Sequence, residues 1–330
     1  MKKREFIRAL AALGAGAGTT GLLAQGGSRR WRVGYLSPQS RADAIQAQSS
    51  TAFVGGLRDL GYVEGRNLDI EWRFADGDAT RLPEMARDLV RLRVDVIVAL
   101  ASQAIRAAQD ATTTIPIVMA TTGDPVGSGF VKSLAHPGGN ITGLSNMGGE
   151  LVPKLLDLLR SVLPRVSRVA VLVSPTSSTS RAMAEGAANA ARQVGMKVIN
   201  VGASSPLEIE AAFATATREG AEAILVGEAT FLTSQRQQIA KLALRDRLPS
   251  VSGNHLLVEA GCLMSYGTKF TENFVRSASY VDKILKGAKP RDLPVEQSTT
   301  LELAVNLKTA NALRVAIPGS ILLRADQVIE

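Results

Sequence analysis

Short runs of β-branched residues alternate with helical stretches along almost the whole chain. The pattern begins with an expected strand at residues 33–36 and an expected helix at 44–60, and it ends with a strand at 301–305 and a helix at 307–313. This alternation predicts parallel sheets with helices on both faces. The run at residues 94–100 is continuously apolar, which is typical of a strand buried on both faces.

The alternation falls into two series, separated by a Gly- and Pro-rich stretch at residues 123–140 and a short apolar run at 141–145. A chain of 330 residues has the length of about two domains. We therefore predict an α/β protein made of two doubly wound parallel-sheet lobes. The two series share an architecture and show no clear sequence repeat.

The N-terminus has the pattern of an export signal. Four basic residues (Lys2, Lys3, Arg4 and Arg8) precede an apolar run of small residues at 9–23, and a small-residue zone follows. We predict a signal peptide at residues 1–24, with a basic segment similar to a twin-arginine signal. The motif GAGTTG at residues 16–21 lies inside this leader with no strand before it, so we assign no dinucleotide site to it.

Charge and composition limit the classes of function. The net charge of +8 suggests a nucleic-acid partner at first sight, but removal of residues 1–24, with four basic residues and one acidic residue, lowers it to +5. Aromatic residues make up only 4% of the chain, which argues against a surface that stacks on bases. We expect no nucleic-acid partner and a solvated, mixed-charge surface.

The residues that common catalytic and metal sites need are scarce. The single cysteine, Cys262, excludes an internal disulfide and a cysteine-based metal site, and His136 and His255 are the two histidines. No nucleophile-elbow, P-loop or zinc-protease motif occurs. We predict neither cofactor nor metal and favour binding over catalysis.

Polar residues follow the expected strands, where an open α/β sheet binds its ligand. Most carry hydroxyl or amide groups, or begin a helix whose free N–H groups favour a negatively charged ligand group. For any one of these residues taken alone, capping of a helix is the favoured explanation. The set predicts a cleft between the lobes lined by Ser37, Ser102, Gln103, Thr122, Asp124, Ser174, Glu228 and Asn254.

Within this set the expected roles differ. Ser102 and Gln103 open a helix and are expected to hold a carboxylate, whereas Glu228 or Asp124 is expected to hold an amine. Tyr35 and Tyr266 are either walls for an apolar part of a ligand or core residues.

Several segments, in order along the chain, resemble the substrate-binding components of ABC transporters, in the branch of the type I periplasmic-binding fold that includes tryptophan-binding components. They are LGYVEGRNL (60–68), RLPE (81–84), VDVIVA (94–99), IPIVM (115–119), GDPVG (123–127), PGGNITGLS (137–145), GCLMSYG (261–267), YVDKILKGA (280–288), LPVEQ (293–297) and NLKTA (306–310). Family members often have Gly-Gly where this chain has Gly261 and Cys262. The cleft loop at residues 226–231 also departs from the family pattern, so the resemblance does not identify the ligand.

The resemblance implies three strands that cross between the lobes, at residues 141–145, at 263–266 and near 299–305. The first lobe is then residues 29–143 plus 269–298, and the second is 144–268 plus 299–330. Ligand binding would close the lobes, and a membrane permease would recognise the closed form.

The resulting expectation is a monomeric periplasmic protein that delivers a small polar solute, such as an amino acid, to an ABC permease. Two alternatives stay open at this point. One is a periplasmic binding protein that reports its ligand to a membrane kinase, and the other is an exported hydrolase on a two-lobed fold.

Overall fold

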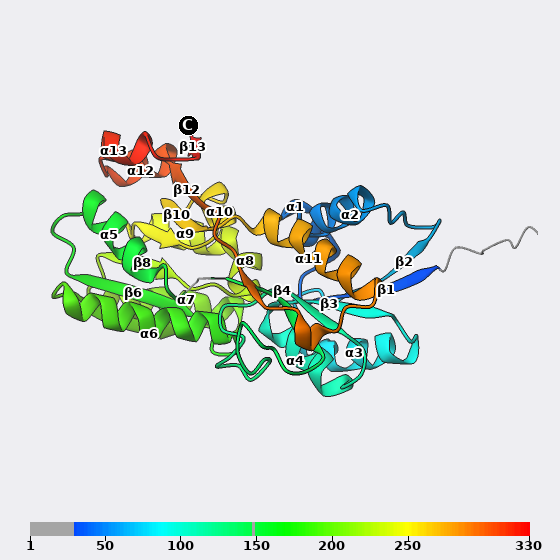
Figure 1. Ribbon diagram of the computed structural model, residues 1–330. Coiled ribbons are helices and arrows are strands. Elements are labelled where there is room, and N and C mark those ends of the chain that lie inside the picture. Colours follow the sequence, from blue (N-terminus) through cyan, green and yellow to red (C-terminus); the bar gives the residue numbers. More distant parts are fainter. Residues whose placement is uncertain (1–29, 147–148) are drawn as a thin grey trace, which may run out of the picture.

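The computed structural model describes residues 30–146 and 149–330. The predicted leader at residues 1–24, with its Gly-rich motif, lies outside the described residues. The described chain forms two α/β lobes that lie end to end, with α6 at one end and β1 and β2 at the other (Figure 1). The predicted fold class is confirmed.

The first lobe is built on a parallel sheet with the strand order β11-β5-β4-β3-β1-β2. Its central strands β3 and β4 are almost completely buried, as their apolar sequence predicts. The strands are β1 (Trp31–Ser37), β2 (Leu68–Phe74), β3 (Val96–Leu100), β4 (Ile117–Thr121), β5 (Ile141–Ser145) and β11 (Glu296–Gln297).

Helices cover both faces of this sheet. One face packs on α2 and α11, and the other on α3 and α4. The helices α2 and α11 are far apart in sequence but lie side by side (Figure 1), and a Cβ atom at Gly56 would lie 3.0 Å from the Ala278 side chain. The helices are α1 (Arg41–Gln46), α2 (Ser49–Asp59), α3 (Leu82–Arg91), α4 (Ala101–Ala111) and α11 (Phe270–Leu285), with 3-10 turns η1 (Ala79–Arg81) and η2 (Pro290–Asp292).

The second lobe has a sheet with the strand order β13-β12-β10-β9-β8-β6-β7. Its strands pair in parallel except that β12 runs antiparallel to β10. They are β6 (Arg168–Val173), β7 (Lys197–Gly202), β8 (Ala223–Val226), β9 (Ser250–Ser252), β10 (Met264–Thr268), β12 (Leu301–Asn306) and β13 (Gln327–Ile329).

The helices of the second lobe also divide between two faces. Side chains of α5, α6, α12 and α13 pack on one face, and side chains of α7, α8, α9 and α10 on the other. These helices are α5 (Val152–Val162), α6 (Ser178–Gln193), α7 (Pro206–Arg218), α8 (Thr230–Ser234), α9 (Arg236–Arg245), α10 (His255–Glu259), α12 (Leu307–Leu313) and α13 (Gly319–Leu322).

The chain passes between the sheets at three places: after β5, between β10 and α11, and between β11 and β12. Backbone hydrogen bonds tie these segments together, from Ser298 to Ser145 at 3.2 Å and from Lys269 to Thr300 at 3.0 Å. Because β5 lies wholly in the first sheet, the predicted boundary after residue 143 falls inside that strand. The division into 29–143 plus 269–298 and 144–268 plus 299–330 stays a prediction about which parts move together.

The helix expected at residues 44–60 is interrupted, and this prediction was wrong. Two helices, α1 and α2, take its place, because Gln48 has a left-handed backbone with a φ of 55°. The hydroxyl of Ser49 donates a hydrogen bond to the carbonyl of Ala44 at 3.0 Å and stabilises the break. The break brings Ala47 and Ser49 to the space between the lobes.

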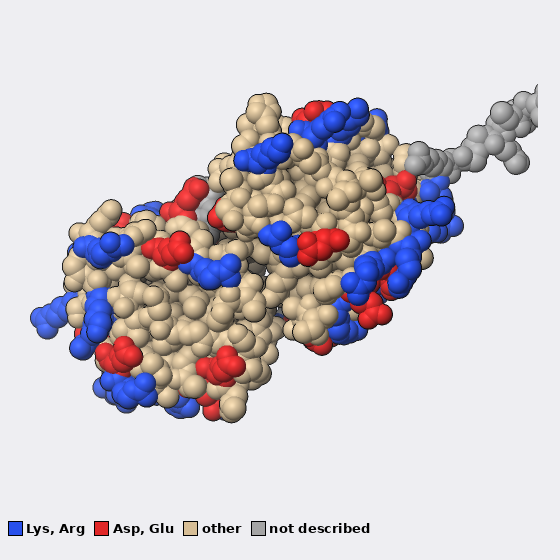
Figure 2. Space-filling model, turned by 90° about the horizontal axis from the view of Figure 1, so that it is seen from below, with Lys and Arg blue, Asp and Glu red and all other residues tan. Residues whose placement is uncertain are grey.

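Charged side chains are interspersed over both lobes on the face seen in Figure 2, and a waist marks the junction of the lobes there. None of the helices in residues 30–146 and 149–330 is both long and apolar enough to span a membrane.

Candidate functional site

A cavity of about 120 Å³ lies between the two lobes. Its walls are formed mainly by the carboxyl ends of strands, as in other open α/β sheets. From the first lobe these are the ends of β3 and β4 and the residue after β5, and from the second lobe the segments that follow β6, β8 and β9.

Six of the eight predicted site residues line this cavity, namely Ser102, Gln103, Thr122, Ser174, Glu228 and Asn254. They come from five different strand ends in two sheets. The fold thus brings together residues that are up to 152 positions apart, as Ser102 and Asn254 are.

Ser37 and Asp124 are not among the lining residues, so the structure does not place them with the other six. The Ser37 hydroxyl is fully buried and accepts a hydrogen bond from the Gln39 backbone N–H at 3.1 Å. The Asp124 carboxylate accepts one from the Gly127 N–H at 2.7 Å. Both side chains therefore stabilise their own loops, as Ser and Asp commonly do in turns.

Tyr35 and Tyr266 are core residues and do not form walls of the cavity. Tyr35 is fully buried against Phe53, Trp72 and Phe74. Tyr266 packs against the core of the second lobe.

The apolar part of the cavity was not found by sequence reasoning. Phe270 and Phe274 reach it from the first turns of α11, and Phe231 reaches it from α8. Phe270 and Phe274 are four residues apart and so lie on one face of their helix, which the sequence could have indicated. Asn146, Ser177, Thr179 and His255 are further lining residues that were missed.

Hydrogen bonds connect the lobes around the cavity. The hydroxyls of Ser102 and Ser178 are 2.8 Å apart, and the Gln103 amide donates to the Thr176 hydroxyl at 2.9 Å. The backbone N–H of Gly123 donates to the Thr179 hydroxyl at 3.0 Å. The structure is therefore a closed arrangement of the two lobes.

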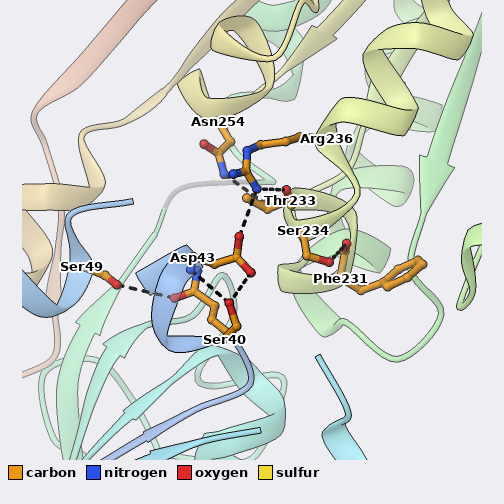
Figure 3. A network of polar contacts seen from close by, with 9 residues as sticks. Ser40, Asp43, Ser49, Phe231, Thr233, Ser234, Arg236 and Asn254 are labelled. Carbon is orange, nitrogen blue, oxygen red and sulfur yellow. Dashed lines mark hydrogen bonds and ion pairs between the residues drawn. The ribbon is translucent and has the colours of Figure 1, made fainter. Parts of the chain in front are cut away.

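An ion pair joins the lobes beside the cavity (Figure 3). Arg236 of α9 lies 3.4 Å from the carboxylate of Asp43 in α1, and the same guanidinium donates to the Thr233 carbonyl at 3.0 Å. The hydroxyl of Thr233 in turn accepts a hydrogen bond from the Asn254 amide at 3.2 Å. Two lining residues, Thr233 and Asn254, are thus part of the network that holds the lobes together.

Glu228 follows β8 and carries the one carboxylate among the lining residues. Its Oε2 atom is buried and has no hydrogen-bond partner among the described residues. Burial raises the pKa of this carboxyl to about 7, although hydrogen bonding with the Asn146 side chain opposes the rise.

His255 begins α10 and forms the other ionisable group of the lining. Its Nδ1 atom lies 2.7 Å from the Glu302 carboxylate on β12. Although burial opposes protonation of this imidazole, the neighbouring Glu302 raises its pKa above the ordinary value. In the described part of the chain, no cluster of three or more His, Cys, Asp or Glu side chains could hold a metal ion.

Two α/β lobes that close over a small cavity define a solute-binding protein of the type I periplasmic-binding fold. The chain belongs to the ABC transporter substrate binding protein family, whose model matches residues 42–329. The members of this family bind solutes and are not enzymes.

Three relatives illustrate the similarity. A tyrosine-binding protein of Clostridioides difficile (strain R20291) is 26% identical over 266 residues, which cover 81% of this chain and 76% of the relative. The structure of an ABC domain from Streptococcus pneumoniae in complex with L-Trp is 27% identical, with a TM-score of 0.84 over 91% of this chain and 100% of that one. The ligand-free, open structure of a substrate binding protein with adhesive properties from Clostridium difficile is 25% identical, with a TM-score of 0.68 over 91% of this chain and 99% of that one.

Proposed function

We propose that this protein is the periplasmic substrate-binding component of an ABC importer and captures a small amphiphilic solute of the amino-acid class. The observation that carries the proposal is the cavity itself, because it is lined from both lobes and surrounded by hydrogen bonds between them. A ligand in that cavity contacts both lobes and so favours the closed form over the open one.

The proposed ligand contacts combine polar and apolar groups. Ser102, Gln103, Thr122, Ser174, Glu228 and Asn254 supply hydrogen-bonding groups, and Phe231, Phe270 and Phe274 supply an apolar wall. Small-molecule sites commonly have a few polar groups that orient the ligand between apolar surfaces. The relatives with tyrosine in their name and L-Trp in their structure support an amino-acid-like ligand.

Binding can be tested by thermal unfolding of the purified protein with the proteinogenic amino acids, including L-tyrosine and L-tryptophan, and with small amines and sugars. At least one compound should raise the melting temperature progressively with concentration. A Ser102→Trp variant, whose indole would fill the cavity, should lose that response. If the folded wild-type protein responds to no compound, ligand capture is contradicted.

Location and transport need a separate experiment in the cells that produce the protein. The expected export signal predicts that osmotic shock releases the protein with the periplasmic fraction. Deletion of the gene should reduce uptake of the compound found in the thermal screen, because a permease would receive it only from this protein. Normal uptake in the deletion strain would contradict the importer role. We expect the protein to act as a monomer, which size-exclusion chromatography with light scattering would show.

A further inference from the structure

The cavity has an unbalanced set of charges. Glu228 supplies a carboxylate, and no lysine or arginine is among the lining residues. The imidazole of His255 is 2.7 Å from Glu302 and is therefore already engaged with a carboxylate. A second hollow of about 650 Å³ shares Gln39 and Gln103 with the cavity and likewise has no lysine or arginine among its lining residues.

The fold holds the Glu228 carboxylate in place and leaves one of its oxygens without a partner. The Glu228 N–H donates to the Met183 sulfur at 3.2 Å, and its carbonyl accepts from the Ser177 hydroxyl at 3.0 Å. The side chain lies over Gly253, where a Cβ atom would be 2.0 Å from Oε1. A buried acceptor with no donor costs free energy, and a donor supplied by the ligand would remove that cost.

The groups predicted to hold a carboxylate of the ligand are engaged elsewhere. The Ser102 hydroxyl pairs with Ser178, and the Gln103 amide donates to Thr176. Both contacts connect the two lobes, so they form part of the closed state. Among its lining side chains, the closed cavity therefore has a negatively charged group for an ammonium and no lysine or arginine for a carboxylate, for which Ser102, Gln103 and the N–H groups at the start of α4 supply only neutral donors.

We propose, on the basis of the function proposed above, that Glu228 selects ligands by a positively charged amino group, and that the cavity accepts small amines whether or not they carry a carboxylate. The ammonium group of such a ligand donates to Glu228, and its apolar body lies against Phe231, Phe270 and Phe274. Hydrogen bonds between charged groups are the strong ones, so the amine contributes more to affinity than the carboxylate does.

The test is isothermal titration calorimetry at pH 8 with two matched sets of ligands. One set is L-tyrosine, tyramine and 3-(4-hydroxyphenyl)propionate, and the other is L-leucine, 3-methylbutylamine and 4-methylpentanoate. In the set that binds, the affinity for the amine should be within roughly tenfold of the affinity for the amino acid. The affinity for the acid without an amino group should be roughly 10- to 100-fold lower than that for the amino acid.

Two variants distinguish the role of Glu228 from a general effect of charge. Glu228→Gln keeps the size of the side chain and should lower the affinity for the amine roughly 10- to 100-fold. Glu210→Gln removes an exposed carboxylate from α7 of the same lobe and should leave affinity unchanged. Unchanged amine binding by Glu228→Gln would overturn the proposal.

The remaining outcomes separate this proposal from the proposed function. If amino acids bind and their matched amines do not, the ligand carboxylate is required, so the proposal is wrong and the importer role is untouched. If the thermal screen finds only ligands that have no amino group, the proposal is also wrong. If nothing binds in either experiment, both fail.

Discussion

Glu228 is a carboxyl group that the fold largely removes from water. Burial raises its pKa from the ordinary 4.5 to about 7, so the folded state binds its proton more tightly than the unfolded state does. The free energy of unfolding of the ligand-free protein should therefore fall as the pH rises from 4.5 to 7, by up to about 3 kcal/mol.

This pH dependence can be measured by urea unfolding of the wild-type protein and of Glu228→Gln between pH 4 and 8. The variant should lose the part of the slope that belongs to Glu228 while retaining the contribution of His255. Amine affinity of the wild type should rise through the same pH range, because the ionised carboxylate is the form that pairs with an ammonium group. Parallel stability curves for the two proteins would contradict the assignment.

Gly253 makes room for the Glu228 carboxylate, since a Cβ atom there would lie 2.0 Å from Oε1. Gly253→Ala should displace the carboxylate and weaken amine binding roughly tenfold, and it should have little further effect in a Glu228→Gln background. Calorimetry on the two single variants and the double variant measures this coupling. Gly55→Ala is the matched control, because its Cβ atom would meet no other atom within 4 Å. Additive effects of the two changes would show that Gly253 does not act through Glu228.

At the scale of residues, the sequence predicted six of the residues that line the cavity, all of them just after strand ends, and missed Asn146, which follows β5. Thr122 directly follows a buried strand, and Ser102 and Glu228 each lie two residues after the end of one. The edge of a parallel sheet brings such positions together. The sequence could not separate Ser37 and Asp124 from this set, because a hydroxyl or carboxylate that binds its own loop looks the same in sequence as one that faces a ligand.

At the scale of elements, strongly apolar strands and capped helices were predicted best. The helix α6 begins at Ser178, and the Ser177 hydroxyl caps it by accepting a hydrogen bond from the Ser180 N–H. The break between α1 and α2 was missed because it depends on the left-handed backbone of Gln48, a residue with no marked preference for that conformation.

A side chain placed at the contact between β10 and the segment after β9 should have a large effect on stability. A Cβ atom at Gly267 would lie 1.8 Å from the Gly253 carbonyl oxygen, and neither backbone can move away easily. Gly267→Ala should lower the free energy of unfolding by about 1–3 kcal/mol. Gly139→Ala, at an exposed position with no atom within 4 Å, should change it by less than about 0.5 kcal/mol. Urea unfolding compares the two, and equal stabilities would contradict the close packing.

At the scale of the whole molecule, closure depends on contacts between side chains of different lobes. The sequence predicted two lobes and a cleft, whereas the pairs that bridge the cleft, such as Asp43 with Arg236, are 193 residues apart and follow no local pattern. Such pairs depend on how the two sheets are placed relative to each other, which strand and helix preferences do not determine.

A substitution at Gly123 should block closure of the lobes without changing the fold of either lobe. A Cβ atom there would lie 2.4 Å from Cγ2 and 2.7 Å from Oγ1 of Thr179 in the other lobe. Gly123→Ala should therefore weaken ligand binding roughly tenfold or more while the ligand-free protein keeps its stability. Adding Thr179→Ala removes both nearest atoms and should restore part of the affinity. Calorimetry gives the affinities, and small-angle scattering should show a larger radius of gyration for Gly123→Ala with ligand present. An unchanged affinity would mean that the closed arrangement is not the ligand-bound state.

The most direct test of ligand capture is native mass spectrometry of the protein as purified, followed by identification of what it releases on denaturation. We predict one small amine bound per wild-type chain and its loss from Glu228→Gln and Gly123→Ala. A folded wild-type protein that carries no small molecule, and that none of the screened compounds stabilises, would contradict the account.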